Sequence, residues 1–157
     1  MSETIHEPIT GREETIEDHT PLAALSQFYR ALNNRDIVLM ERNWNTTGEA
    51  AMDNPLGGIK RGWSEIRSVY QRLFAGSYQY NFEFYDYTLQ CYGDIFIAIG
   101  RERGQLSSEG GEKLELAIRT TRIFFRNQNR WRQLHHHGSI EDPRMLARYQ
   151  EAVGRKN

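Results

Sequence analysis

The period at which apolar residues recur changes once along the chain, and this change limits the folds that the sequence can adopt. Between residues 22 and 75 the apolar side chains return every three or four positions, which is the period of an amphipathic helix. From residue 78 to residue 140 they return every second position, which is the period of a strand. Helices followed by hairpin-linked strands are typical of an α+β domain, in which the helices cover one face of an antiparallel sheet.

Caps and turns divide the helical part into three expected helices. The first begins at Thr20-Pro21, where an N-cap hydroxyl precedes a proline. The second follows a break at residues 33–36, and the third runs from about residue 63 to residue 75. Residues 52–58 contain an Asn-Pro and a Gly-Gly pair, so we expect a loop there.

Turns likewise separate four expected strands, which are residues 78–89, 95–103, 113–126 and 131–140. Asp142-Pro143 then begins a final helix. The sequence therefore predicts a cone-shaped α+β roll, with three N-terminal helices packed on a strongly curved antiparallel sheet and an extra C-terminal helix.

Three segments follow from this order. Residues 1–19 hold six acidic residues and little apolar periodicity, so we expect a flexible acidic arm that is dispensable for folding. Residues 20–141 form the folded domain, and residues 142–157 form the C-terminal helix and tail.

The charge balance disfavours a nucleic-acid partner and an anionic membrane surface, because 20 basic residues face 21 acidic ones. The one cysteine, Cys91, forms no intramolecular disulfide and is compatible with a reducing compartment. No leader-like segment and no run of about 18 apolar residues is found. From these features we expect a cytoplasmic protein without a membrane or nucleic-acid partner.

Some expected strands carry apolar side chains on both faces. Ile95, Ile97 and Ile99, for example, alternate with Phe96 and Ala98. The helices can cover only one face of the sheet, so the other face needs a partner. We expect a homodimer or a larger homo-oligomer that associates through this outer face.

Two motifs within residues 21–140 resemble known proteins. The first resembles ketosteroid isomerases and their polyketide-cyclase-like relatives, and comprises Asn54-Pro55-Leu56-Gly57, Gly62, Ile66 and Tyr70. The second is similar to the association domain of calcium/calmodulin-dependent protein kinase II, and comprises Thr121-Arg122-Ile123-Phe124, Trp131 and His135-His136-His137-Gly138-Ser139. The resemblance implies the nuclear transport factor 2-like superfamily, with a cystatin-like fold around a small-molecule pocket. Because this superfamily hosts enzymes, transport factors and assembly hubs, the resemblance leaves the activity open.

The isomerase resemblance fails at two positions that the chemistry needs. The general-base Asp of those enzymes precedes the loop proline, where this chain has Asn54, and their oxyanion-hole Tyr corresponds to Phe28. Amide and phenyl groups cannot perform these proton transfers, so steroid isomerisation is not expected. Tyr29 follows Phe28 and Asp53 precedes Asn54, but both side chains are expected to point elsewhere.

Two arginines continue apolar faces of expected strands. Arg101 follows an isoleucine face of the second strand, and Arg122 follows a leucine and isoleucine face of the third. The kinase-domain resemblance implies that both point into the pocket and favour an anionic ligand such as a carboxylate. The alternative is an exposed side chain, or a structural ion pair with one of three carboxylates: Glu102, Glu115 or Asp53.

The three consecutive histidines allow either acid–base chemistry or a structural role. His135 and His137 share one face of a strand, while His136 points to the other. A metal is not expected, because no further ligand pattern accompanies them. His135, His137 and Asp53 are the candidate catalytic residues, and no cofactor is expected.

Three functions remain open. The first is a self-associating small-molecule-binding protein with a semi-polar pocket, in which the ligand-binding candidates are Arg101, Arg122, Asn54, Trp63, Tyr70 and Trp44. The second is a cofactor-independent polyketide-cyclase-like isomerase, lyase or cyclase, in which pocket His and Asp side chains transfer protons. The third is a protein-assembly module. Whether the protein is an enzyme is left open.

Overall fold

The computed structural model describes residues 3–14 and 19–154, and its element order confirms the α+β class. The helices and strands are α1 (Pro21–Asn33), α2 (Ile37–Asn43), β1 (Ala51–Asp53), β2 (Lys60–Arg61), α3 (Gly62–Ala75), β3 (Tyr78–Tyr92), β4 (Ile95–Ser108), β5 (Lys113–Asn127), β6 (Arg130–Ser139) and α4 (Pro143–Gly154). No helix among the described residues is long and apolar enough to cross a membrane.

The expected helix caps are present. Thr20 Oγ1 accepts a hydrogen bond from the Ala23 amide at 3.2 Å, which satisfies an otherwise unpaired donor in the first turn of α1. Asp36 plays the same part for α2, since its carboxylate accepts from the Leu39 amide at 3.0 Å. These caps explain why the helix starts could be read from the sequence.

The sheet is mixed rather than fully antiparallel. Its strand order is β2-β1-β6-β5-β4-β3, and β1 runs parallel to β6, with Met52 opposite His136. The prediction that residues 52–58 form a loop is therefore wrong for Met52 and Asp53. A strand of three residues is too short to show a period-two pattern, so only its pairing with β6 reveals it.

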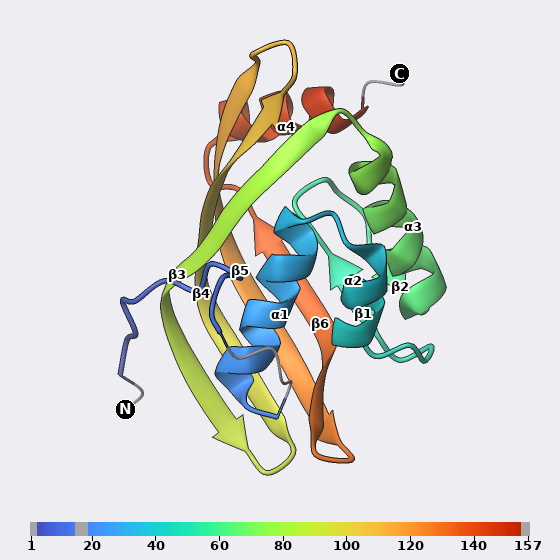
Figure 1. The fold of residues 1–157 in the computed structure, drawn as a ribbon, viewed down its shortest axis with the longest axis vertical. Coiled ribbons are helices and arrows are strands. Elements are labelled where there is room, and N and C mark those ends of the chain that lie inside the picture. Colours follow the sequence, from blue (N-terminus) through green and yellow to red (C-terminus); the bar gives the residue numbers. More distant parts are fainter. Residues whose placement is uncertain (1–2, 15–18, 155–157) are drawn as a thin grey trace.

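Helices α1 to α3 cover the concave face of the curved sheet, and α4 lies across its upper end (Figure 1). The core between them is rich in aromatic side chains, including Phe96 and Phe124, whose stacked rings lie 4.6 Å apart. Trp44 is fully buried, and Trp63 is nearly so. Burial of such large side chains supplies much of the stability of a domain of this size.

Two β-bulges change which residues face the helices. In β3 the register shifts between Tyr85 and Thr88, and Asp86 has a φ of 48°. In β6 the register shifts after Gln133, because Ile123 pairs with His135 while Phe124 pairs with Gln133. An extra residue in one strand exchanges its two faces from that point on.

Residues 3–14 correct the expectation of a flexible arm, because they are packed against the domain. Ile9 is buried and its backbone exchanges hydrogen bonds with Phe84, at 2.8 and 2.9 Å. Arg30 of α1 donates to the carbonyls of Gly11 and Glu13. Apolar periodicity missed this segment because its contacts with the core come from two isoleucines, Ile5 and Ile9, which are too few to show a period. Residues 1–2 and 15–18 lie outside the described residues.

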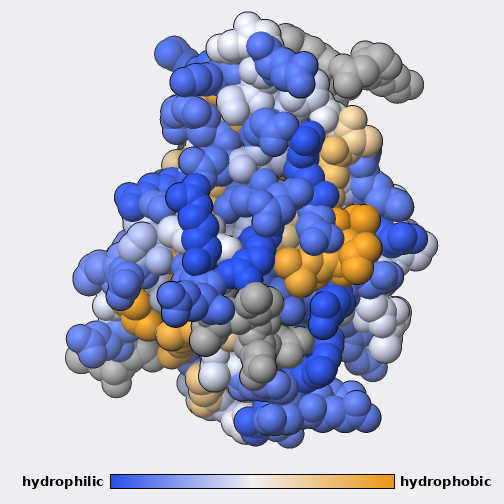
Figure 2. Space-filling view, viewed as in Figure 1, coloured by the Kyte–Doolittle hydropathy of each residue, from blue (hydrophilic) through white to orange (hydrophobic). Residues whose placement is uncertain are grey.

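The surface on the helix side is mostly hydrophilic, with a hydrophobic patch over α2 (Figure 2). Val38 of this helix has 66% of its surface exposed. On the other side of the sheet, Ile95 and Ile99 are also exposed, at 38% and 43%. The outer face therefore keeps the apolar character that motivated the expectation of a partner.

Candidate functional site

A small cavity of about 50 Å³ lies inside the cone, between α1, α4 and the sheet. We call it the inner cavity. Its wall includes seven residues whose chemistry matters below: Phe28, Asn54, Tyr70, Glu102, Arg122, His136 and Tyr149. Phe28 and Asn54 thus stand in the wall where a ketosteroid isomerase would need Tyr and Asp, so proton transfer by those two groups is absent from this wall.

Arg122 is fully buried and its charge is met by a carboxylate of the protein. Its Nη2 donates to Glu102 Oε1 at 2.5 Å, and Tyr29 Oη donates to the same oxygen at 2.6 Å. The guanidinium carbon also lies 3.6 Å from the centre of the Phe28 ring. The expected alternative of a structural ion pair is therefore present, and Glu102 is the partner.

A chain of amides continues this arrangement behind Arg122. Gln133 Oε1 accepts from Arg122 Nη1 at 2.6 Å, and Gln133 Nε2 donates to Asn43 Oδ1 at 3.2 Å. Asn43 in turn donates to the Ala24 carbonyl of α1 at 2.8 Å. The buried charge is thus tied to two helices and two strands, which is how a buried ion pair is made tolerable.

His136 is the histidine that the cavity contains. Burial, and secondly the positive charge of Arg122, hold the pKa of His136 well below its ordinary value, so the ring is neutral. Its Nδ1 is buried and has no hydrogen-bond partner within residues 3–14 and 19–154. An unpaired polar atom in a cavity wall is available to a bound molecule.

Tyrosine side chains make the rest of the cavity wall weakly polar. Burial raises the pKa of Tyr70 and of Tyr149 above the ordinary tyrosine value, so both hydroxyls stay neutral. Gly138 faces the same region, and a Cβ there would come within 3.1 Å of Pro55 and 3.2 Å of the His136 ring. Position 138 therefore leaves little space for a side chain larger than that of glycine.

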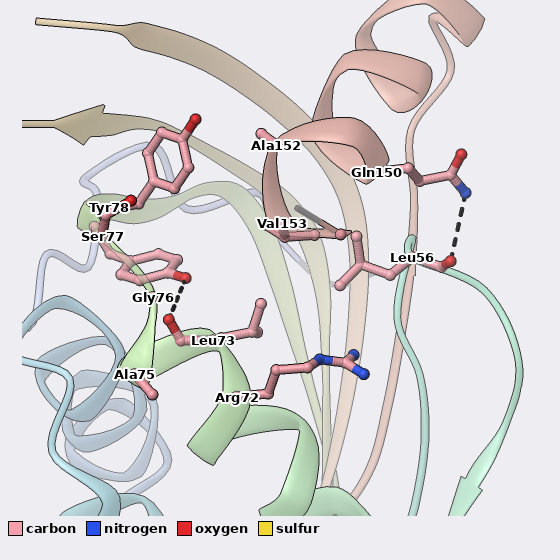
Figure 3. A pocket seen from close by; sticks show the side chains of 12 residues that line it. Leu56, Arg72, Leu73, Ala75, Gly76, Ser77, Tyr78, Gln150, Ala152 and Val153 are labelled. Carbon is pink, nitrogen blue, oxygen red and sulfur yellow. Dashed lines mark hydrogen bonds between the residues drawn. The ribbon is translucent and has the colours of Figure 1, made fainter. Parts of the chain in front are cut away.

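A larger hollow of about 450 Å³ lies where the C-terminal ends of α3 and α4 come close together. We call it the mouth hollow. Figure 3 shows Arg72 and Leu73 on one side of it, and Val153 and Gln150 of α4 with Leu56 on the other. Gln150 Nε2 donates to the Leu56 carbonyl at 3.4 Å, which holds α4 to the loop. Leu73 and Tyr80 contribute to both the mouth hollow and the inner cavity.

The structure places Arg101 away from Arg122, on the outer face of β4. Its side chain is about half exposed and lies near two carboxylates, Asp86 at 3.6 Å and Glu141 at 3.9 Å. The expectation that Arg101 points into the pocket therefore needs correction, because Glu102 takes the inner position. The isoleucine face of β4 is the outer one.

The structure brings the three catalytic candidates together, but outside the cone. His137 Nδ1 lies 2.5 Å from Asp53 Oδ2, and His135 Nε2 lies 3.3 Å from Asp53 Oδ1. Because the bulge in β6 exchanges the faces, His136 enters the cavity while His135 and His137 face outward. We call Asp53, His135 and His137 the outer cluster.

Among the aromatic candidates, Tyr70 lines the inner cavity, whereas Trp44 and Trp63 are core residues outside both hollows. Trp63 Nε1 donates to Glu41 at 2.8 Å.

Sequence reasoning missed Glu102 and His136 as cavity residues. The signal for Glu102 was its position between Gly100 and Gly104, which share its face. A Cβ at either glycine would clash with β3, at 2.5 Å from Tyr87 or from the Asn81 carbonyl.

The chain belongs to the SnoaL-like domain family, whose model matches residues 22–143. This family comprises ligand-binding proteins and proteins of the isomerase and cyclase type. No curated protein matches the sequence significantly.

Solved structures with the same fold include nuclear transport factor 2-like and cystatin-like proteins. A candidate dehydratase of the nuclear transport factor 2-like family from Streptomyces avermitilis superposes with a TM-score of 0.70 at 20% identity, over 74% of this chain and 91% of that one. A protein of the nuclear transport factor 2-like superfamily from Salmonella enterica superposes with a TM-score of 0.68 at 17% identity, over 76% of this chain and 87% of that one. A candidate calcium/calmodulin-dependent protein kinase type II association domain from Thiobacillus denitrificans gives 0.64 at 25% identity, over 78% and 96%. The predicted superfamily and fold are confirmed.

Proposed function

We propose that the protein binds a small organic molecule whose bulk fills the mouth hollow and whose polar end reaches the inner cavity. The observation that carries this proposal is the unpaired Nδ1 of His136, a buried polar atom in the wall of a cavity. A mostly apolar hollow with a few convergent polar groups is typical of a small-molecule site.

The same geometry favours an uncharged ligand. Arg122 already has a full ion pair with Glu102, so a carboxylate in the inner cavity would compete with Glu102 for the guanidinium. An additional buried charge without a partner is costly. We therefore propose a neutral hydroxyl, carbonyl or amide as the polar end, in place of the carboxylate that the arginine pattern suggested.

Calorimetric titration with 2-naphthol and with 2-naphthoate compares a neutral and an anionic probe of the same shape. We expect 2-naphthol to bind at least about tenfold more tightly, which corresponds to about 1.4 kcal/mol. Val153→Trp should fill the mouth hollow and abolish binding, whereas Val38→Trp on the exposed face of α2 should leave it unchanged. Tighter binding of 2-naphthoate, or equal binding by Val153→Trp, would contradict the proposal.

A second function is an acid–base enzyme that uses the inner cavity. It is favoured by the presence of a neutral imidazole and a carboxylate, His136 and Glu102, in one wall. His136→Gln keeps a hydrogen-bonding group but cannot transfer a proton. Retained binding together with lost conversion of a bound compound would identify an enzyme, and unchanged conversion would exclude His136 as its base.

We also propose that two copies associate through the outer face of the sheet, where Ile95 and Ile99 are exposed. Sedimentation at micromolar concentration should show a dimer or larger assembly, and Ile99→Lys should shift it toward the monomer. A wild-type monomer under these conditions would remove this proposal without affecting the ligand site.

A further inference from the structure

The outer cluster is assembled by the pairing of β1 with β6. The parallel register sets Ala51 opposite His135 and Asp53 opposite His137, so alternate residues of both strands meet on the outer face. Asp53 is the least exposed member, with 26% of its side chain accessible, against 33% for His135 and 56% for His137. The cluster therefore sits in the surface with one side open.

The hydrogen bond of His135 fixes where its ring proton is. His135 Nδ1 lies 3.0 Å from the Ala51 carbonyl oxygen, which can only accept, so Nδ1 carries the proton. In the neutral ring Nε2 then has a lone pair, and the Nε2 atom lies 3.3 Å from Asp53 Oδ1. Two electron-rich atoms in such a position repel each other unless a positive charge lies between them.

One oxygen of Asp53 likewise lacks a partner among the described residues. Its Oδ1 is buried and makes no hydrogen bond to any residue that the structure describes. Its other oxygen is bound to His137 Nδ1 at 2.5 Å. A carboxylate that is held by one histidine and faces the lone pair of another is arranged to accept a cation.

From this geometry we propose that Asp53, His135 and His137 bind a divalent transition-metal ion of the zinc class on the outer face of the sheet. Metal–ligand bonds of about 2.0–2.1 Å in a tetrahedral site set neighbouring ligand atoms about 3.3 Å apart. This separation is found between His135 Nε2 and Asp53 Oδ1. The ligand atoms of all three side chains lie within 4.8 Å of one another.

The ligand set also indicates which ions are favoured. Two imidazoles with one carboxylate suit zinc, cobalt or nickel, whereas magnesium and calcium prefer oxygen ligands. The carbonyl bond of His135 orients the ring, as the outer hydrogen bonds of metal-bound histidines do. For His137 Nδ1 to bind the metal, the proton that it shares with Asp53 Oδ2 would leave this nitrogen, and Nε2 of the same ring would carry the single proton of the neutral imidazole.

Three protein ligands leave at least one coordination position of the metal free. Among the described residues, no further His, Cys, Asp or Glu joins the group. His137 also lines an open groove of about 480 Å³ on the outer face, together with Thr121 and Ser139. A three-ligand metal facing a groove has room for water or a small exogenous ligand.

Calorimetric titration of zinc chloride into the untagged full-length protein, dialysed against a chelator beforehand, tests the site. We expect one zinc ion per chain, with an affinity reduced at least about a hundredfold by Asp53→Asn, which exceeds the loss usual for outer partners of a metal site. Asp86→Asn is the matched control, because Asp86 lies in the same groove outside the cluster. It should leave zinc binding unchanged.

Cobalt(II) supplies an independent readout that does not rely on Asp53. The wild type should show the intense visible absorption of four-coordinate cobalt, and His137→Gln should lose it while its circular dichroism matches the wild type. Zinc binding that survives both Asp53→Asn and His137→Gln would overturn the proposal. Absence of saturable binding in the wild type would show that the cluster holds a proton only.

Discussion

Arg122 and Asp53 carry opposite charges on the two faces of one sheet, and they differ in whether their polar atoms have partners within the protein. On the inner face, Arg122 is bound to Glu102, Gln133 and Tyr29, and only 1% of its surface is exposed. On the outer face, Asp53 has one bound oxygen and one buried oxygen without a hydrogen bond to the described residues. A buried charge with all its partners supports the fold, whereas a charge with an unmet partner is available to a ligand.

The same contrast separates the three histidines. His136 lies on the inner face opposite Arg122, while His135 and His137 lie on the outer face beside Asp53. The three residues are consecutive, so alternation along the strand separates His136 from the other two but does not say which face is the inner one. The β6 bulge decides which face each histidine takes.

The largest expected effect comes from breaking the inner ion pair. Arg122→Leu would leave Glu102 buried without its cation, and such changes cost about 3–5 kcal/mol of the free energy of unfolding. Arg101→Leu removes an outer-face arginine from an exposed ion pair and should cost about 1 kcal/mol or less. Urea denaturation of both variants measures the difference. Equal losses would contradict the assignment of Arg122 to the fold.

A double variant sharpens this result. Arg122→Met with Glu102→Leu removes both charges, so neither is left unpaired, and most of the lost stability should return. If the double variant is less stable than Arg122→Leu alone, Glu102 has a stabilising role apart from Arg122.

The packed arm gives the next largest effect. Ile9 is buried against β3, so Ile9→Ala should lower the free energy of unfolding by about 2–3 kcal/mol. The exposed Ile59 serves as the control, and Ile59→Ala should change it by less than about 0.5 kcal/mol. Matching values for the two variants would restore the earlier expectation of a dispensable arm.

A smaller effect on the free energy of unfolding, seen at alkaline pH, reports how far Tyr80 is shielded from water inside the cone. Burial raises the pKa of Tyr80 to about 12, although Arg35 acts in the opposite direction. The pKa of Tyr80 in the folded state exceeds the unfolded value of about 10. The contribution of Tyr80 to the free energy of unfolding is therefore complete below pH 10 and is lost as the pH rises toward 12.

Tyr80→Phe should therefore be less stable than the wild type at pH 8, by about 1 kcal/mol for the lost hydrogen bond to the Leu73 carbonyl. The difference between the two free energies of unfolding should narrow at pH 11, because keeping Tyr80 neutral costs the wild type about 1.4 kcal/mol per pH unit and costs the variant nothing. Denaturant unfolding at both pH values measures this. A constant difference would mean that Tyr80 is hydrated.

The fold was largely predictable from the sequence because its signals are local. The Thr20 and Asp36 caps and the change of period at residue 78 each depend on neighbouring residues. The candidate site was less predictable because its signals are not local. The bulge at Leu134 decides which histidine enters the cone, and no residue type marks it. Glu102 was missed because the isoleucines of β4 suggested the wrong inner face.

The most direct test of the contrast between the faces is the nitrogen NMR spectrum of the histidine rings during titration with zinc. We expect the ring nitrogen signals of His135 and His137 to change most, while those of His136 stay close to their neutral positions. Assignment by His135→Gln, His136→Gln and His137→Gln makes the comparison unambiguous. A spectrum in which His136 changes most, or in which no ring responds, would contradict the division of the sheet into a closed inner face and an open outer one.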